Sequence, residues 1–353
     1  MNYPSKASYS LEESVSLPVM RDLTSSDRPS VYRIYGVTLA SNFPFVTQLV
    51  KGDGAPDVTF RLAHGPPVAE PDKDTHIFKG LFGLHVYQQR DFQVMHYAKR
   101  GIEYHLWPQD IVCHLLRPNQ GYRTEIYTEI YLLGPVLSVW LELQGIPNLH
   151  ASAVAVEDHA VGFLATSTGG KSTLAATMLQ AGYPLLTDDI LCVERREEAF
   201  WGRPGFPQMR LWPDQARYFL GHYEELDSLT PQTTKRRVPV GENGLGTFCG
   251  ASRPLACLYL PERRDPTTWG TRVEVTPVSR VEALVSLIGQ GFSSSVVEKL
   301  GLRRHRFDLF GSLASQVPIY RLVYPEGVQY LPYVRQAILD SLTNLSPPEE
   351  RVG

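Results

Sequence analysis

Short segments of mixed hydrophobic and polar residues fill the first third of the chain from Val31 onward. They are rich in β-branched and aromatic residues, and turns containing Gly, Pro, Asp or Lys-Arg-Gly separate them. This pattern predicts β-strands. The predicted strands are Val31–Leu39, Asp57–Leu62, His76–Tyr87, Phe92–Ala98 and Ile102–Trp107. We therefore expect a small antiparallel β-rich domain over residues 30–120, after a flexible arm over residues 1–29 that is rich in Ser, Pro and charge.

The pattern then changes to a helical one. Between Arg123 and Gln144, apolar residues recur every three to four positions, which is typical of one buried helix face. Pro135 lies inside this segment and should kink or split the helix, because proline cannot donate the backbone hydrogen bond. Gly145 is a natural stop after it.

Strands and helices follow one another from Ser152 to Leu342, which predicts an α/β domain over residues 121–345. Val161–Ala165 is an almost continuous apolar run, as expected of a strand covered on both faces. Lys171–Ala181 has the period of a helix and ends at Gly182. The other predicted strands are Ser152–Glu157, Leu185-Leu186, Ile190–Val193, Leu255–Leu260 and Ile319–Val323, and the other predicted helices are Val281–Ile288 and Val328–Leu342. Residues 346–353 are predicted to be a flexible tail.

Composition and charge narrow the classes of partner. The chain has 353 residues, of which 43% are hydrophobic and 20% charged, as in an ordinary globular protein. Its formal net charge of −3 gives no electrostatic reason to expect nucleic acid or an anionic membrane as the main partner. The most apolar run, Tyr131 to Leu141, is shorter than the roughly 20 residues that span a bilayer.

The four cysteines, Cys113, Cys192, Cys249 and Cys257, are far apart and form no CxxC pair. They are predicted to be reduced thiols in the core, and neither structural zinc nor a disulfide framework is expected. The N-terminus lacks a basic segment followed by an apolar core, so no signal peptide is expected. A cytoplasmic protein is therefore predicted.

A phosphate-binding loop is the most informative motif. The segment Ala165-Thr166-Ser167-Thr168-Gly169-Gly170-Lys171-Ser172 matches the end of the GxxxxGK(S/T) pattern and lies between a predicted strand and a predicted helix. The first glycine of the pattern is Ala165 here, and its methyl group could strain the turn. A helix N-terminus that follows a Ser/Thr-rich turn, without a ligand, is the alternative interpretation.

Each residue type in this loop suits the binding of ATP. Two glycines allow a sharp turn that brings backbone N–H groups close to phosphate oxygens, and the helix that follows adds its positive dipole end. Lys171 would contact the β- and γ-phosphates, and Ser172 would offer its hydroxyl to Mg²⁺. The predicted nucleotide contacts in the loop are Thr166, Ser167, Thr168, Gly169, Gly170, Lys171, Ser172 and Thr173.

An acidic pair follows the next predicted strand. Asp188 lies 17 residues after Lys171, and Asp189 follows it. Ligands collect at the carboxyl ends of strands in parallel α/β sheets, so this position would put both carboxylates beside the loop. One carboxylate can hold Mg²⁺ while the other accepts the proton of an attacking hydroxyl. An Asp-rich turn without chemistry is the alternative.

Three further polar positions are candidates. His150 precedes the predicted strand pair that leads into the loop, although a lone histidine is more often structural. Arg210 could neutralise charge on a transferring phosphoryl group. Arg236 belongs to the basic cluster Lys235-Arg236-Arg237, which could contact ATP or an acidic acceptor. For Arg210 and this cluster, a solvated charged surface is the alternative.

The segment Asn148–Glu194 resembles the bacterial HPr kinase/phosphorylase family, in particular its HPr-kinase-related branch with kinases of lasso-peptide gene clusters. It shares the upstream His, the loop, the turn after the helix and the Asp-Asp pair. The resemblance implies a fold related to phosphoenolpyruvate carboxykinase and a serine kinase that uses ATP and Mg²⁺. It further implies that Asp188 is the general base, that His150 tunes Asp188, and that Asp189 helps to hold the metal. Family members form oligomers, so a homo-oligomer is expected.

Two departures from the family bear on the substrate. The Glu-Val/Ile-Arg-Gly-x-Gly signature of the phosphorylase reaction is not found, and Thr173 replaces an acidic residue after the loop Ser. A phosphorylase reaction and HPr as the substrate are therefore not expected. The leading hypothesis is a kinase that phosphorylates a Ser hydroxyl on a peptide or small protein. The alternatives are a kinase of free serine or another small metabolite, and a nucleotide-binding module with little catalysis, which Ala165 favours.

Overall fold

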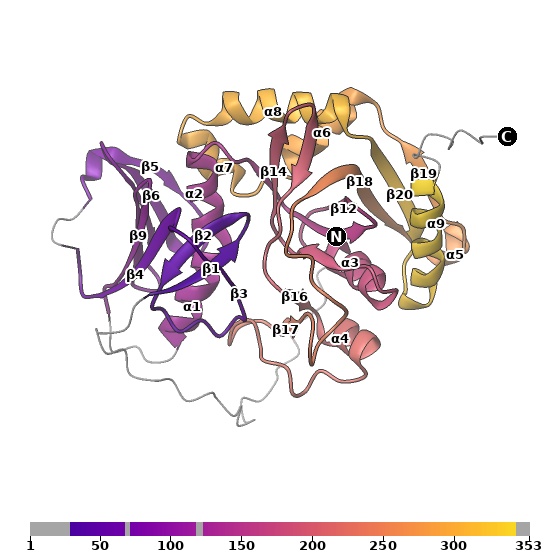
Figure 1. Ribbon diagram of the computed structural model, residues 1–353, viewed down its shortest axis with the longest axis horizontal. Coiled ribbons are helices and arrows are strands. Elements are labelled where there is room, and N and C mark those ends of the chain that lie inside the picture. Colours follow the sequence, from indigo (N-terminus) through magenta and orange to yellow (C-terminus); the bar gives the residue numbers. More distant parts are fainter. Residues whose placement is uncertain (1–28, 68–70, 118–122, 344–353) are drawn as a thin grey trace.

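The computed structural model describes residues 29–67, 71–117 and 123–343. The predicted arm, apart from residue 29, and the predicted tail lie outside these ranges. The chain forms a mixed α/β structure with two large sheets, one at each end of the view in Figure 1.

The first sheet contains nine strands in the order β3-β1-β2-β4-β9-β8-β7-β6-β5. Its strands are β1 (Ser30–Ile34), β2 (Val37–Ser41), β3 (Val50–Lys51), β4 (Val58–His64), β5 (His76–Lys79), β6 (Leu84–Gln88), β7 (Gln93–Tyr97), β8 (Ile102–Leu106) and β9 (Asp110–Leu115). Short 3₁₀ turns, η1 (Lys73–Thr75) and η2 (Leu81–Gly83), precede β5 and β6.

The predicted antiparallel meander is confirmed for β5 to β8, and β9, which was not predicted, extends it in the same antiparallel way. The prediction is wrong for β4, which pairs in parallel with both β2 and β9. The predicted strand Val31–Leu39 is a hairpin, β1–β2, whose turn residues Tyr35 and Gly36 have φ values of 52° and 73°. His76–Tyr87 is likewise two strands. Apolar residues occur within both connections, such as Tyr35 in the first and Leu81 in the second, so hydrophobicity alone does not reveal the breaks.

A kinked helix packs on the first sheet, as predicted for residues 123–144. It comprises α1 (Arg123–Tyr131), a π-helical turn η4 (Leu132–Val136) and α2 (Leu137–Leu143). The kink lies at Pro135 and at Gly134, whose φ and ψ are both −109°. Tyr127 and most residues from Leu132 to Leu141 share a hydrophobic core with the sheet. Although residues 121–345 were predicted as one domain, this helix packs with the sheet before it.

The second sheet contains the strands that follow in sequence. Its strand order is β10-β14-β15-β18-β12-β11-β13. In addition, β20 pairs with β18, and β19 pairs with β20. These strands are β10 (Asn148–Leu149), β11 (Ala151–Val156), β12 (His159–Leu164), β13 (Leu185–Thr187), β14 (Leu191–Arg196), β15 (Ala199–Gly202), β18 (Arg253–Arg264), β19 (Glu274–Pro277) and β20 (Ile319–Pro325).

Helices cover both faces of the second sheet (Figure 1). On one face, α3 (Lys171–Gln180), α4 (Pro213–Leu220) and α9 (Leu331–Thr343) enclose one core. On the other, α6 (Arg280–Gly289) and α8 (Arg303–Gln316) enclose another. Three short helical segments complete this half: α5 (Pro266–Trp269), α7 (Ser294–Lys299) and η5 (Val328–Tyr330).

A separate two-stranded ribbon, β16 (Gln208–Leu211) with β17 (Arg236–Pro239), lies between the two large sheets in Figure 1. Its two strands are antiparallel, with Leu211 opposite Arg236. The two ends of the intervening segment 212–235 therefore lie next to each other. This ribbon brings Arg210 to the candidate site described below.

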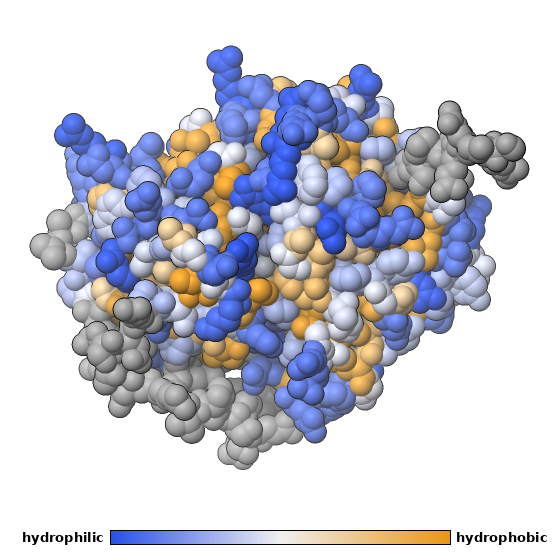
Figure 2. Space-filling view, viewed as in Figure 1, coloured by the Kyte–Doolittle hydropathy of each residue, from blue (hydrophilic) through white to orange (hydrophobic). Residues whose placement is uncertain are grey.

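The four cysteines are buried and free, as predicted. One helical stretch, Thr124–Leu143, is long and apolar enough to cross a membrane, but 72% of its apolar window is buried inside the protein, as in a core helix. On the face drawn in Figure 2, hydrophobic residues lie in scattered groups among hydrophilic ones.

Candidate active site

The candidate site lies at one edge of the second sheet. Strand β12 is parallel to β18, which is parallel to β20. Strand β11 is antiparallel to both β12 and β13, so β13 also runs parallel to β12. The carboxyl ends of β12 and β13 therefore meet at this edge, together with the start of β11. This arrangement explains why the loop at 165–170, the acidic pair and His150 come together although they are far apart in sequence.

The loop turns sharply at Thr168 and Gly170, whose φ values are 68° and 92°. Arg263, at the end of β18, donates a hydrogen bond of 2.6 Å to the Thr168 carbonyl and so fixes the tip of the loop. Gly170 is the N-cap of α3 and has no side chain to cap the first backbone N–H groups of the helix. These N–H groups can therefore bind an anion at the helix N-terminus.

Ala165, which replaces the first glycine of the motif, fits without strain. It is not among the described residues with positive φ, so its conformation does not require glycine. Its methyl group faces Gly169, where an added Cβ would lie 2.4 Å from the Ala165 Cβ. Ala165 is thus accommodated because residue 169 is a glycine.

Lys171, the first residue of α3, is only 6% exposed. Its Nζ donates to the Thr166 carbonyl across the loop at 3.3 Å. Burial lowers the pKa of the Lys171 ammonium, and the carboxylates of Asp189 and Asp188 counteract this shift only in part. The ammonium is therefore held inside the loop with little solvation, where an added anion would stabilise it.

Asp188 is buried and accepts three hydrogen bonds. The hydroxyls of Ser152 and Ser172 donate to its Oδ1 at 2.6 and 2.8 Å, and the backbone N–H of Arg210 donates to its Oδ2 at 2.9 Å. The carboxylate is thus fixed next to the loop serine. Ser152, on β11, was not recognised from the sequence as part of the site.

Asp189 has a φ of 74°, which turns its side chain away from that of Asp188. Its Oδ1 lies 3.1 Å from His150 Nε2, and its Oδ2 accepts from Arg210 Nη1 at 2.6 Å. Burial alone would raise the pKa of Asp189, but Arg210 and then His150 and Lys171 hold it well below its usual range. His150 therefore contacts Asp189, whereas the family resemblance implied that it tunes Asp188.

These groups line an open cavity. Every predicted site residue except Thr166 and Arg236 lines it: His150, Ser167, Thr168, Gly169, Gly170, Lys171, Ser172, Thr173, Asp188, Asp189 and Arg210. Thr166 lies at the base of the loop, where its carbonyl accepts from Gly169 N and Lys171 Nζ.

Arg236 does not line the cavity, in contrast to its predicted nucleotide contact. Its guanidinium donates to the Leu226 carbonyl and the Ser228 hydroxyl, at 3.2 and 2.8 Å, and so holds the segment before β17. Arg237 is buried in an ion pair with Glu129. Of the basic cluster, only Lys235 lines the cavity.

Trp212, Gln215 and Lys235 also line the cavity and were not predicted as site residues. Trp212 directly follows β16 and Lys235 directly precedes β17, so the pairing of these strands brings them together. The Lys235 ammonium lies 5.2 Å from the centre of the Trp212 ring. Recognition of the β16–β17 hairpin in the sequence would have indicated both residues.

The oxygen atoms at this edge fit Mg²⁺. Within the described ranges, no group of three or more His, Cys, Asp or Glu side chains could by itself hold a metal ion. Mg²⁺ usually binds one or two carboxylates and completes its shell with waters and substrate phosphates. The Asp188 carboxylate beside the Ser172 hydroxyl matches this requirement.

Comparisons with known proteins give little further information. No family model matches the chain, and no curated protein matches it. Among solved structures, it is similar to the Hpr(Ser) kinase/phosphatase from Coxiella burnetii, with 9% identity over 56% of this chain and 99% of that chain. The TM-score is 0.28, which supports no inference about function.

Proposed function

We propose that the protein is a kinase that binds ATP with Mg²⁺ and transfers the γ-phosphoryl group to a serine hydroxyl on a peptide or small protein. The observation that carries this proposal is the contact of Ser172 with Asp188 at the carboxyl edge of the sheet. It joins the loop motif to the acidic pair, as in phosphate-loop enzymes in which a serine of the loop and a strand-end carboxylate share the metal. The proposed catalytic domain is accordingly a phosphate-loop domain related to the HPr kinase family.

Each side of the cavity supports one part of this chemistry. The backbone N–H groups at the start of α3 and the Lys171 ammonium would bind the β- and γ-phosphates of ATP. Mg²⁺, when bound, would neutralise charge on the phosphate oxygens. Arg210 lines the cavity beside Asp189 and would stabilise the charge on the transferring group. The loose transition state of phosphoryl transfer requires little beyond such positioning and charge stabilisation.

We propose that Asp188 faces the metal and Asp189 faces the acceptor, the reverse of the division that the family resemblance implied. Asp188 is only 6% exposed and is already fixed by two serine hydroxyls, so an acceptor has little access to it. The side chain of Asp189 is 26% exposed, and that of its partner His150 is 25% exposed. An acceptor hydroxyl could reach this pair, which would orient it and take its proton.

The test measures transfer of labelled γ-phosphate from ATP·Mg²⁺ to Ser-containing peptides, HPr and free serine. Asp188→Asn should weaken Mg²⁺-dependent ATP binding, whereas Asp189→Asn should preserve binding and lower turnover by about 100-fold or more. The opposite pattern would support Asp188 as the base. Asp158→Asn is the matched control, since Asp158 is an exposed residue in the turn at the far end of β11.

The acceptor that gains label decides between the kinase hypotheses. Label on free serine and not on peptides would replace the peptide acceptor with a small metabolite. ATP binding without label on any acceptor would contradict the kinase proposal and support a nucleotide-binding module with little catalysis. The strain at Ala165 that favoured such a module is not observed, because its methyl group packs against Gly169.

A further inference from the structure

The two partners of Asp189 are each supported by a buried Glu–Arg pair. His150 approaches Asp189 from the start of β11, and Arg210 approaches it from β16. Glu142 pairs with Arg306 and contacts the backbone at Asn148, close to His150. Glu129 pairs with Arg237, the residue opposite Arg210 in the β16–β17 ribbon. Both glutamates belong to the kinked helix α1–η4–α2, which packs on the first sheet.

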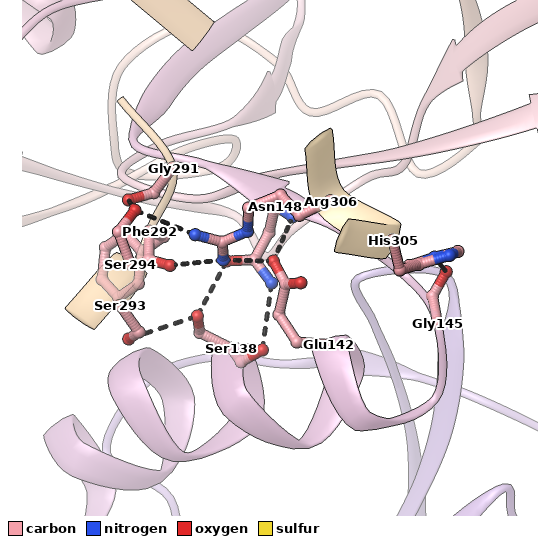
Figure 3. A network of polar contacts seen from close by, with 10 residues as sticks. All are labelled: Ser138, Glu142, Gly145, Asn148, Gly291, Phe292, Ser293, Ser294, His305 and Arg306. Atoms are coloured by element: carbon pink, nitrogen blue, oxygen red, sulfur yellow. Dashed lines mark hydrogen bonds and ion pairs between the residues drawn. The ribbon is translucent and has the colours of Figure 1, made fainter. Parts of the chain in front are cut away.

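The Glu142–Arg306 pair holds the backbone at Asn148, two residues before His150, and at Phe292 (Figure 3). Glu142 Oε1 accepts from the backbone N–H of Asn148 at 3.0 Å and from Arg306 Nη2. Arg306 also donates to the Phe292 carbonyl at 2.7 Å and to the Ser294 hydroxyl at 2.8 Å. All of the side chains that make these contacts lie in one cluster at the end of α2.

The segment that Arg306 holds is itself bonded to His150. The His150 N–H donates to the Gln290 carbonyl at 2.7 Å, and the Phe292 N–H donates to the Asn148 carbonyl at 3.0 Å. The Phe292 ring meets the His150 ring edge to face, with 5.6 Å between their centres. A shift of Arg306 would therefore move both the backbone and the ring environment of His150.

The Glu129–Arg237 pair supports Arg210, the second partner of Asp189. Arg237 Nη1 donates to Glu129 Oε1 at 2.5 Å, and Arg237 is the residue directly opposite Arg210 in the β16–β17 ribbon. Glu129 also accepts from the backbone N–H groups of Val46 and Thr47 at 2.6 and 3.1 Å. The loop after β2 and the ribbon that carries Arg210 are thus tied to the same carboxylate.

We propose that the helix α1–η4–α2 is a positioning element of the active site, with Glu142–Arg306 setting His150 and Glu129–Arg237 setting Arg210 against Asp189. This inference rests on the proposed kinase function for its kinetic consequences, but not on which aspartate is the base. Arg306, Arg237 and the two glutamates are positioning residues, because none of them lines the cavity.

The experiment compares Arg306→Met with Arg303→Met, which makes the same substitution on the same helix at an exposed ion pair with Glu298. The first readout is the set of ¹⁵N and ¹H ring resonances of His150 in the nucleotide-free protein. The second is kcat beside the Kd for ATP·Mg²⁺. A displacement of about 1 Å in a catalytic group can lower the rate roughly 100-fold.

We expect Arg306→Met to shift the His150 resonances and to lower kcat about 10- to 100-fold. The Kd for ATP should stay within about twofold of the wild-type value, because the loop contacts are separate from this cluster. Arg303→Met should change neither readout. Glu129→Gln, which perturbs Arg210, should likewise lower kcat more than it changes the Kd.

Unchanged His150 resonances and unchanged kcat in Arg306→Met would overturn the inference and leave the pair a purely structural one. If that variant does not fold, Gly291→Ala takes its place, since the added Cβ would lie 2.6 Å from Arg306 Nη1 without removing any charge. If the wild-type protein phosphorylates no acceptor, the proposed function fails. The His150 resonances then decide the positioning inference alone.

Discussion

At the scale of single residues, the buried ammonium group of Lys171 carries an energetic cost for folding. An amine whose folded-state pKa lies below its unfolded value destabilises the fold wherever both states are protonated. This cost is fully present below the folded pKa, and it disappears as the pH rises toward the ordinary lysine pKa of about 10.4. Because the pKa of Lys171 is lowered by burial, its charge destabilises the fold at neutral pH.

Lys171→Met should therefore stabilise the nucleotide-free protein while it removes ATP binding. We expect the free energy of unfolding to rise by about 1 kcal/mol at pH 7, since apolar replacements of buried charges are often stabilising. The gain should shrink as the pH approaches about 10, where the wild-type amine can lose its proton. Urea denaturation of the wild-type protein and the Met variant at pH 7 and 10 measures this difference in the free energy of unfolding. A less stable Met variant at pH 7 would contradict the prediction.

The residue types of the site could be predicted from the sequence, but their pairing could not. Gly-Gly-Lys-Ser between a strand and a helix indicates phosphate contacts, because those residue types have few other reasons to occur in that order. The partner of each aspartate depends on the left-handed φ of Asp189, which sends neighbouring side chains in different directions. No periodicity encodes this angle, so the contact of His150 with Asp189 rather than Asp188 became visible only in the structure.

At the scale of elements, the apolar helices were predicted well, whereas a polar helix, a short ribbon and the strand β9 were missed. The helices over Lys171–Ala181 and Val281–Ile288 are found almost unchanged as α3 and α6. Helix α8 was missed because it begins with Arg-Arg-His-Arg and buries Arg306 among its few inward-facing residues. The β16–β17 ribbon was missed because its strands are four residues long and separated by more than 20 residues.

A side chain that is distant in sequence contacts the kink of the helix α1–η4–α2. Pro135 has no N–H to donate within the helix, and Gly134 departs from helical φ and ψ. The Tyr35 hydroxyl, from the turn between β1 and β2, donates to the Leu133 carbonyl at 2.9 Å. Tyr35 is 1% exposed, so water cannot replace it.

Tyr35→Phe should leave the Leu133 carbonyl buried without this donor and lower the free energy of unfolding by about 1–3 kcal/mol. Tyr97→Phe is the matched control, because Tyr97 is also buried and its hydroxyl has no hydrogen-bond partner within the described part of the chain. That variant should be neutral or slightly more stable. Chemical denaturation of the three proteins provides the comparison, and equal losses in both variants would show that Tyr35 does not support the kink.

At the scale of the whole molecule, the two large sheets are joined by a common core. The core beneath the first sheet also contains Ile190, Cys192, Phe206, Val296 and Leu300 from the second half of the chain. The ion pairs Glu129–Arg237 and Glu142–Arg306 cross the same boundary. Separating the halves would expose apolar residues and leave buried charges unpaired, both of which are costly.

This continuity predicts that the protein unfolds as one unit, even though two domains were predicted from the sequence. ATP·Mg²⁺ at about 100 times its Kd should then stabilise the whole chain by about 2.7 kcal/mol. Amides of β6–β8, far from the site, should gain roughly 100-fold protection from hydrogen exchange, as should those of α3. Lys171→Met should show no gain, because it removes ATP binding. Protection confined to the second sheet would instead mean that residues 30–120 open independently, and that the helix α1–η4–α2 does not link the two sheets energetically.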